Sequence, residues 1–124
     1  MLGRDRVVFN LIVLRHLASQ DELGKHMPAY FIAEHIVTDD AKFLEFVTKA
    51  RPVMAKHSGR YLTKTSTHKM PEGGHWKPDR VFIVEFPDMD ALNAFYNSPE
   101  FRALTALRKS STSDQAMLFV LEGA

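Results

Sequence analysis

The sequence predicts an α+β fold built as one small domain, and three observations lead to this prediction. Short stretches rich in β-branched and aromatic residues, typical of strands, alternate with two stretches whose apolar residues recur every three or four positions, as in helices. Their order along the chain is strand, helix, strand, strand, helix, strand. The length of 124 residues suits a single domain, and 45% hydrophobic with 25% charged residues is an ordinary globular composition.

The first strand is followed by a long helix. Residues 30–37 are rich in strand-forming side chains, and both faces of this strand are largely apolar, as in the centre of a sheet. Residues 38–40, Thr-Asp-Asp, offer N-cap side chains and negative charge for a helix start. The apolar face of that helix comprises Phe43, Phe46, Val47, Ala50, Val53, Met54 and His57. Pro52 is expected to bend the helix, and Gly59 to end it.

The two middle strands differ in polarity. Residues 60–70 contain threonines and a tyrosine, which favour a strand, but their polar character predicts an edge position. Residues 71–78 carry prolines and glycines and are expected to form a loop. Residues 81–86 form the most apolar stretch, so we expect a central strand there, ended by Pro87.

The last third predicts two helices and a final strand. Asp88 and Asp90 are expected to open a helix over residues 89–97. Ser98 followed by Pro99 predicts a break and a second, short helix. The face of that short helix comprises Phe101, Leu104, Leu107 and Arg108. Residues 116–121 are predicted to form the last strand.

This order of elements is the ferredoxin-like βαββαβ arrangement with a four-stranded, antiparallel-type sheet. Right-handed crossovers are expected to make the first and third strands parallel neighbours in its middle. Both helices then cover one face, and the other face is left uncovered although its strands are apolar. Since soluble monomers rarely expose such a surface, we expect a homodimer through the sheet face.

Composition excludes several classes of protein. Sixteen basic and fifteen acidic residues give a net charge of +1, which predicts no nucleic-acid partner. No apolar run has the length of a membrane span, so no membrane partner is expected. The absence of cysteine excludes disulfides and thiol chemistry and fits a cytoplasmic location. Residues 1–26 are interpreted as an N-terminal extension, mobile or packed on the surface, before a single domain over residues 27–124.

The sequence predicts neither a metal nor a cofactor. The histidines His35, His57, His68 and His75 lack the spacings of common metal motifs. The pair of glycines at 73 and 74 lacks the other features of a phosphate-binding loop, and no serine stands in a nucleophile-elbow motif.

Two glutamates are candidates for acid–base chemistry. Glu85 lies within the most apolar strand, where a carboxylate is either paired or has a raised pKa. It could act as a catalytic base or substrate anchor, or form a structural ion pair with Arg80 or Arg108. Glu34 lies on the first strand and, if it shares a face with Glu85, could form a carboxylate pair or bind substrate. The alternative is a surface or interface carboxylate.

Three further residues are candidates for ligand binding or catalysis. Arg80 begins a strand and could bind an anion or pair locally with the preceding aspartate. Tyr96 could point its hydroxyl into a pocket as a catalytic donor or serve as a core residue at the rim. Arg108 ends an apolar helix face, where it could reach a bound substrate or cap helix carbonyls.

Several linked motifs resemble a known family. They are Met27-Pro28-Ala29-Tyr30, Gly59-Arg60-Tyr61-Leu62, Trp76-Lys77-Pro78-Asp79-Arg80, Glu85-Phe86-Pro87, Phe95-Tyr96-Asn97-Ser98-Pro99-Glu100-Phe101 and Leu107-Arg108. Together, over about residues 27–123, they resemble the small bacterial proteins grouped as domain of unknown function 1330. Two segments depart from that family pattern: the extension before Met27, and the loop segment over residues 68–75.

The resemblance implies the dimeric α+β barrel, in which two ferredoxin-like subunits join through their sheets. It also implies similarity in fold to small monooxygenases, haem-degrading enzymes and muconolactone isomerases, with a pocket between sheet and helices in each subunit. The family has no settled activity, so the resemblance names no reaction.

Two hypotheses on function follow. In the first, the chain binds or transforms a small, partly apolar, anionic molecule in the pocket between sheet and helices. In the second, it is a non-catalytic homodimeric binding or interaction module, and its polar residues are structural. Whether the chain is an enzyme stays open at the level of sequence.

Overall fold

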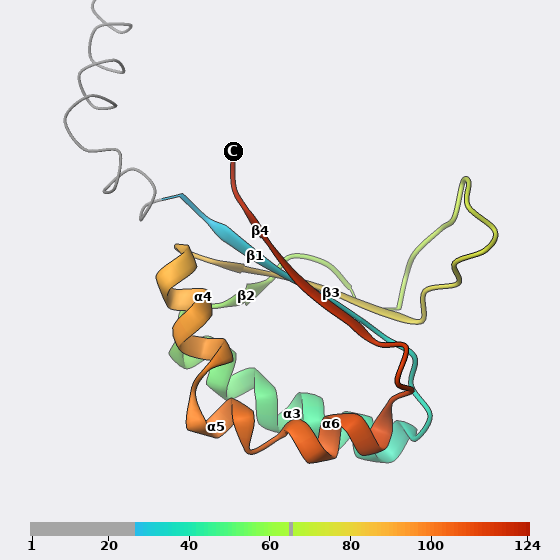
Figure 1. Cartoon of the computed structure of the whole chain (residues 1–124), viewed down its shortest axis with the longest axis horizontal. Helices are drawn as coiled ribbons and strands as arrows, with labels where there is room; N and C mark the ends of the chain where they lie inside the picture. Colours follow the sequence, from blue (N-terminus) through green and yellow to red (C-terminus); the bar gives the residue numbers. More distant parts are fainter. Residues whose placement is uncertain (1–26, 65) are drawn as a thin grey trace, which may run out of the picture.

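The structure, a computed structural model, describes residues 27–64 and 66–124. The elements are β1 (Ala29–His35), α3 (Asp40–Lys56), β2 (Arg60–Tyr61), β3 (Arg80–Phe86), α4 (Met89–Tyr96), α5 (Pro99–Arg102), α6 (Thr105–Ser111) and β4 (Met117–Glu122). The helices of the described residues, α3 to α6, lie on one side of the sheet (Figure 1). The predicted α+β fold is therefore confirmed, whereas the extension over residues 1–26 lies outside the described residues.

The sheet has the strand order β2-β3-β1-β4, with β3 and β1 in its centre as predicted. Every pairing in it is antiparallel, including that of β1 with β3. The expectation of parallel central strands was therefore wrong. The α3 crossover returns β2 to the direction of β1, and β3 pairs antiparallel with β2, so β3 must run opposite to β1.

The second strand is much shorter than predicted. Only Arg60 and Tyr61 pair with β3, at Glu85 and Val84, and the amide of Leu62 makes one further bond to the carbonyl of Ile83. The chain then leaves the sheet in a long loop that projects on the side away from the helices (Figure 1). An edge strand has a neighbour on one side only, so its extent depends on that neighbour more than on its own side chains.

The helix starts agree with the predicted caps. Asp39, Asp88 and Ser98 each accept a hydrogen bond from a backbone amide three residues on, at 3.0, 2.8 and 3.2 Å. Helix α3 continues through Pro52 to Lys56. Its end requires Gly59, because a Cβ at that position would lie 2.8 Å from the ring of Phe86.

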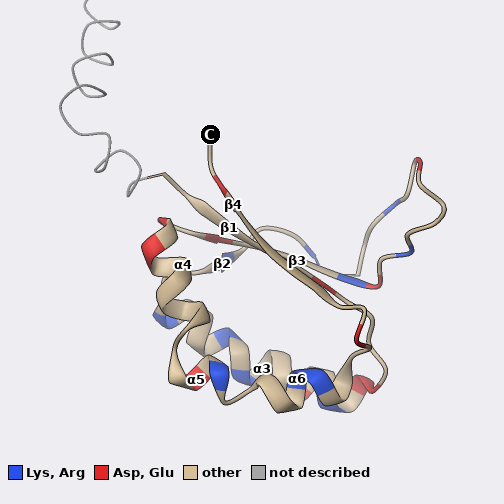
Figure 2. Cartoon of the chain, in the orientation of Figure 1, with Lys and Arg blue, Asp and Glu red and all other residues tan. Residues whose placement is uncertain are grey.

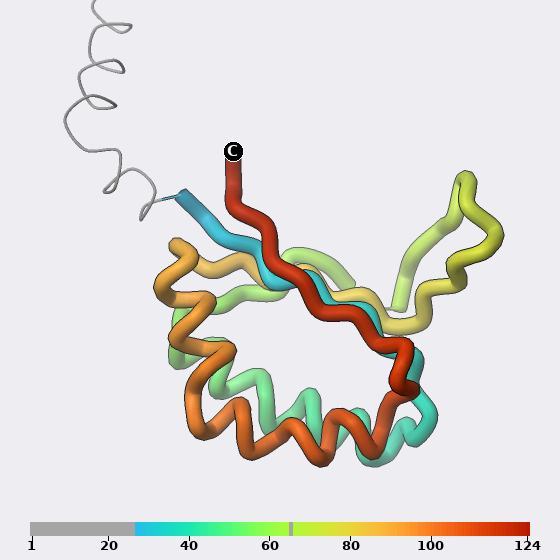
Figure 3. The backbone as a smooth tube through the Cα atoms, viewed as in Figure 1, coloured from blue at the N-terminus to red at the C-terminus, as the bar shows by residue number. Residues whose placement is uncertain are grey.

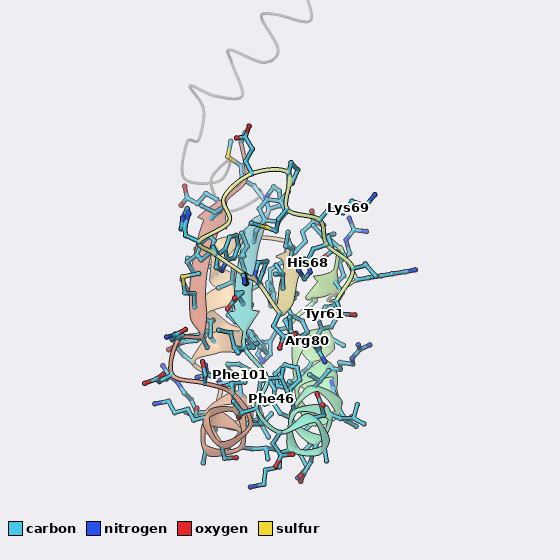
Figure 4. The ribbon with its side chains drawn as sticks, turned by 90° about the vertical axis from the view of Figure 1, so that its right-hand side faces the viewer. Phe46, Tyr61, His68, Lys69, Arg80 and Phe101 are labelled. Carbon is cyan, nitrogen blue, oxygen red and sulfur yellow. The ribbon has the colours of Figure 1, made fainter. Side chains whose placement is uncertain are left out.

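Helices α3 and α6 lie side by side beneath the sheet (Figures 3 and 4). The core between the layers is aromatic, with Phe46 and Phe101 placed between helices and sheet (Figure 4). The ring of Phe95 packs against those of Phe31 and Phe101, with centroids 5.7 and 4.4 Å apart. We call this helix-covered side of the sheet the covered face.

The opposite side, which we call the open face, carries the alternate residues of each strand. In β1 these are Tyr30, Ile32 and Glu34, and in β4 they are Met117, Phe119 and Leu121. The three β4 side chains are exposed by 46%, 47% and 51%. Charged side chains are few along the sheet and more frequent on the helices and loops (Figure 2). In the described part of the chain no helix covers this apolar face.

Among the described helices, none combines the length and the hydropathy that crossing a membrane requires.

Candidate binding site

A cavity lies between the covered face and helices α3, α5 and α6. Its lining consists of Phe31, Ala33, His35, Phe46, Val47, Ala50, Met54, Tyr61, Phe82, Phe101, Arg108 and Leu118. The enclosed space is about 20 Å³, which is room for roughly one water molecule. With the opening to solvent included, the unfilled volume is about 340 Å³. A larger ligand therefore has to widen the cavity, and its lining offers aromatic rings with three polar side chains.

Arg108 brings a positive charge to this cavity from α6. Its Nε is buried and has no hydrogen-bond partner among the described residues. Burial lowers the pKa of Arg108 from its ordinary value; the nearby Tyr96 raises this pKa, and Arg102 lowers it. No described carboxylate forms an ion pair with Arg108. Since a guanidinium stays charged in proteins, the cavity contains a half-buried, uncompensated cation.

His35 is the second polar group. It lies at the end of β1 on the covered face, only 3% exposed, with its ring 5.4 Å from that of Phe43 and 5.8 Å from that of Phe82. Its buried Nδ1 has no described partner. Burial, reinforced by the charge of Arg108, lowers the pKa of His35 to about 4. The imidazole is therefore neutral at pH 7.

Tyr61 is the third polar group, at the edge of the sheet in β2. Its ring lies 6.0 Å from that of Phe82, and the guanidinium of Arg51 sits over it at 4.9 Å. Burial raises the pKa of Tyr61, against the effect of Arg51, so the phenol keeps its proton at neutral pH. The cavity thus combines a cation, a neutral imidazole and a phenol in an aromatic setting.

Of the residues predicted for the site, Arg108 alone lines this cavity. Tyr96 lies close to it, in a neighbouring groove between α4 and β4 that is also lined by Leu92 and Asn93. The guanidinium of Arg102 sits over the Tyr96 ring at 4.7 Å. Tyr96 is therefore within electrostatic reach of Arg108 but opens onto a different space.

Arg80 forms the predicted local pair with Asp79 and a longer contact with Asp40 on α3, at 3.5 Å. Asp79 also accepts a hydrogen bond from the amide of Val37, 2.9 Å away. The arginine thus stabilises the junction between β3 and the start of α3, at one end of the sheet.

Glu85 and Glu34 both lie on the open face, away from the cavity. Glu85 forms an ion pair, which was one of its two predicted alternatives, but its partner is the Nε of Arg60 at 2.8 Å and neither Arg80 nor Arg108. Arg60 is its cross-strand neighbour in β2. Glu34 is 3% exposed, and its Oε1 accepts a hydrogen bond from the indole of Trp76 at 3.2 Å.

The two glutamates do not form a carboxylate pair. The register places Tyr30 opposite Glu85 and Val81 opposite Glu34. They are therefore four residues apart along the strands, or about 13 Å. Sharing a face was not sufficient for the expected pair, because the register separates the two side chains.

His35 and Tyr61 were missed as site residues, although a signal for His35 was present. Alternate residues of a strand share a face, so His35 lies in line with Phe31 and Ala33, which both face the helices. The part of the chain that the structure describes contains no cluster of three or more histidine, aspartate or glutamate side chains suited to a metal ion.

Comparison with known proteins identifies the family. Residues 28–124 match the family described as "domain of unknown function (DUF1330)", and the chain belongs to that family. A comparison with curated proteins gave no match.

Three of the solved structures that match illustrate the shared fold. A protein of unknown function from Rhodopseudomonas palustris has a TM-score of 0.67 at 16% identity, over 88% of this chain and 92% of that chain. A dimeric ferredoxin-like protein of unknown function from Jannaschia has a TM-score of 0.54 at 13% identity, over 77% and 98% of the two chains. SnoaB, a cofactor-independent oxygenase from Streptomyces nogalater, has a TM-score of 0.52 at 17% identity, over 75% and 91%. At these identities the likeness shows the ferredoxin-like fold alone.

Proposed function

We propose that this member of the DUF1330 family binds a small, partly apolar anion in the cavity between sheet and helices, with Arg108 as its anchor. The observation that carries the proposal is the buried Nε of Arg108, which has no hydrogen-bond partner and no carboxylate within ion-pair distance among the described residues. A half-buried cation without a counter-charge is unfavourable, and a bound anion supplies that charge.

The cavity lining fits the apolar part of such a ligand. Phe31, Phe46, Phe82 and Phe101 present rings to it, and aromatic surface favours contact with aromatic or branched groups. Met54 is the most adaptable side chain of the wall, because its unbranched thioether repacks readily. Its movement would widen the small enclosed space. In this proposal Glu85, Glu34 and Arg80 stabilise the fold and do not contact the ligand. Tyr96 affects ligand binding only through its electrostatic effect on Arg108.

The test is a comparison of two charge-removing variants in the same helix. Arg108→Gln removes the proposed anchor, whereas Lys109→Gln removes an exposed positive charge one residue further on. Benzoate is a suitable probe because it joins an aromatic ring to a carboxylate. We expect benzoate to shift the Nε–H resonance of Arg108 in NMR spectra saturably. Calorimetric titration, which needs no resonance of Arg108, should show binding lost in Arg108→Gln and kept in Lys109→Gln; equal binding by both variants would contradict the proposal.

The open face supports the second part of the proposal, a homodimer through the sheets. Met117, Phe119 and Leu121 together expose an apolar stripe, and no helix covers it in the described residues. A second copy would cover the same stripe on both partners, as an isologous interface does. The Jannaschia neighbour is described as dimeric. Sedimentation at micromolar concentration should show a dimer that Phe119→Glu dissociates; a monomeric parent protein would overturn this part.

Whether the chain is a binding module or an enzyme is decided by measuring whether it converts a bound ligand into a product. SnoaB is a cofactor-independent oxygenase, so a protein of this fold can carry out catalysis without a cofactor. If the chain is an enzyme, Arg108→Gln should remove turnover without unfolding the protein. If it is a homodimeric module, ligands bound at Arg108 should be recovered unchanged.

A further inference from the structure

We infer that His35 is a second contact for the anion held by Arg108, and that the ligand is a carboxylate whose binding places a proton on His35. The inference rests on the proposed function, because it concerns the same cavity. It narrows the ligand class to an apolar monocarboxylate and gives His35 the role of proton acceptor.

The first argument is geometric. His35 and Arg108 line one cavity from opposite layers, the histidine from β1 in the sheet and the arginine from α6. Each has a buried nitrogen, Nδ1 and Nε, without a partner among the described residues. Buried polar atoms are nearly always hydrogen-bonded, to protein, ligand or ordered water, so two unpartnered nitrogens on side chains that line one cavity can share one bound group. A carboxylate has two oxygens and can accept a hydrogen bond from each side chain.

The second argument concerns the charges around His35. From α3 its neighbours are Phe43 and Phe46, and from β3 it contacts Phe82, none of which titrates. Arg80 is its cross-strand partner, but that guanidinium is already paired with acidic side chains at the start of α3 and in the preceding loop. Arg108 is therefore the uncompensated charge that faces His35.

An anion at Arg108 reverses this electrostatic balance. Without ligand, burial and the positive charge of Arg108 keep the imidazole neutral. A carboxylate between the two side chains offsets the charge of Arg108 and attracts a positive charge at His35, so the pKa of His35 rises on binding. The balanced step is carboxylate plus neutral His35 plus one proton from solvent, giving a carboxylate held between imidazolium and guanidinium.

The sign of the pH dependence follows from linkage. At any pH between the pKa of about 4 of free His35 and its higher pKa in the complex, binding takes up a proton, so affinity rises as pH falls. For one proton the affinity gains at most about tenfold per pH unit. A ligand that only paired with Arg108 would show no such dependence above the pKa of its own carboxyl group.

The experiment uses benzoate as the probe and the full chain as the protein. Calorimetric titrations at about pH 6, near the ordinary pKa of histidine, in buffers of different ionisation enthalpy, count the protons taken up on binding. The Nε–H resonance of Arg108 reports in parallel whether benzoate occupies the site. We expect proton uptake, tighter binding as pH falls, and a ¹⁵N imidazole spectrum that shifts towards the protonated form.

Two variants separate the inference from the proposed function. His35→Gln keeps a polar side chain of similar size but cannot be protonated, so it should bind benzoate at Arg108 without proton uptake or pH dependence. Arg108→Gln should lose binding itself. If benzoate shifts the Arg108 resonance with no proton uptake in the parent protein, the inference on His35 fails while the proposed function stands. If benzoate gives no shift at Arg108, both are overturned.

Discussion

The polar side chains on the two faces of the sheet differ in the partners that they contact. Glu34 and His35 are neighbours in β1, yet they point to different sides. On the open face each carboxylate has one partner, Trp76 for Glu34 and Arg60 for Glu85, although the buried Oε2 of Glu34 has none among the described residues. On the covered face His35 and Arg108 keep buried nitrogens without described partners. What distinguishes the covered face is therefore that two such side chains, one of them a cation, line the same cavity.

The largest expected effect comes from a pair of phenylalanine truncations, one on each face. Phe86 is fully buried on the covered face, whereas Phe119 on the open face is 47% exposed. Phe86→Ala should lower the free energy of unfolding by about 3–5 kcal/mol. Phe119→Ala should lower the free energy of unfolding of the separated subunit by less than about 1 kcal/mol. Urea denaturation at several protein concentrations separates subunit stability from dimerisation. Equal losses at the lowest concentration would show that the two faces are not different in packing.

The second effect is the pH dependence of stability that His35 imposes. Its pKa is lowered from 6.5 to about 4 in the folded chain, so the unfolded chain binds more protons at acidic pH. This contribution to stability is complete above the unfolded pKa of 6.5 and is lost as pH falls towards 4. The loss should be about 3 kcal/mol.

The measurement for His35 is urea denaturation of the parent protein and of His35→Gln over that pH range. The parent should lose more stability than the variant, because only the parent has the buried imidazole. Parallel stability curves for the two proteins would mean that His35 is readily protonated in the folded state. Such a result would also remove the physical basis of the proton uptake inferred for ligand binding.

The third variant tests the hydrogen bond between Trp76 and Glu34, which joins the long loop to the open face. Trp76→Phe keeps an aromatic ring but removes the only hydrogen-bond donor that the described residues give to Glu34. We expect a loss of about 1–3 kcal/mol, as when one partner of a buried hydrogen bond is removed. A double-mutant cycle with Glu34→Gln measures the coupling of the two side chains. A coupling energy of zero would show that the hydrogen bond between Trp76 and Glu34 does not stabilise the position of the loop.

The element order and the helix caps were predictable because they depend on local chemistry, and the central position of β1 and β3 followed from general rules for the connections between strands. Asp39, Asp88 and Ser98 act as caps through their own side chains, and the position of each was readable from the sequence. The direction of β3 against β1 follows from the same connections and was deduced wrongly, whereas the extent of β2 depends on which segments meet in space. Threonines that favour a strand do not form one where no neighbour pairs with them.

The binding site was only partly predictable for a similar reason. Arg108 was identified from its place at the end of an apolar helix face, which the periodicity of the sequence defines. Glu85 drew attention because its strand is apolar, but that strand is apolar on both faces, and the sequence does not state which face the helices cover. Alternation along the strand groups His35 with Phe31 and Ala33, but which side of the sheet the helices cover, and that Tyr61 joins that side, depends on pairing and layering.

The smallest expected effect is that of Glu85→Gln. The carboxylate lies on the open face and pairs with Arg60, whose side chain is 72% exposed. Ion pairs exposed to this degree contribute from zero to about 1 kcal/mol because solvent screens them. Glu85→Gln should therefore change the urea midpoint little and leave benzoate binding at Arg108 unaltered, since the sheet lies between Glu85 and the cavity. Loss of binding or turnover in a folded Glu85→Gln variant would move the functional site to the open face and reverse the assignment of the two faces.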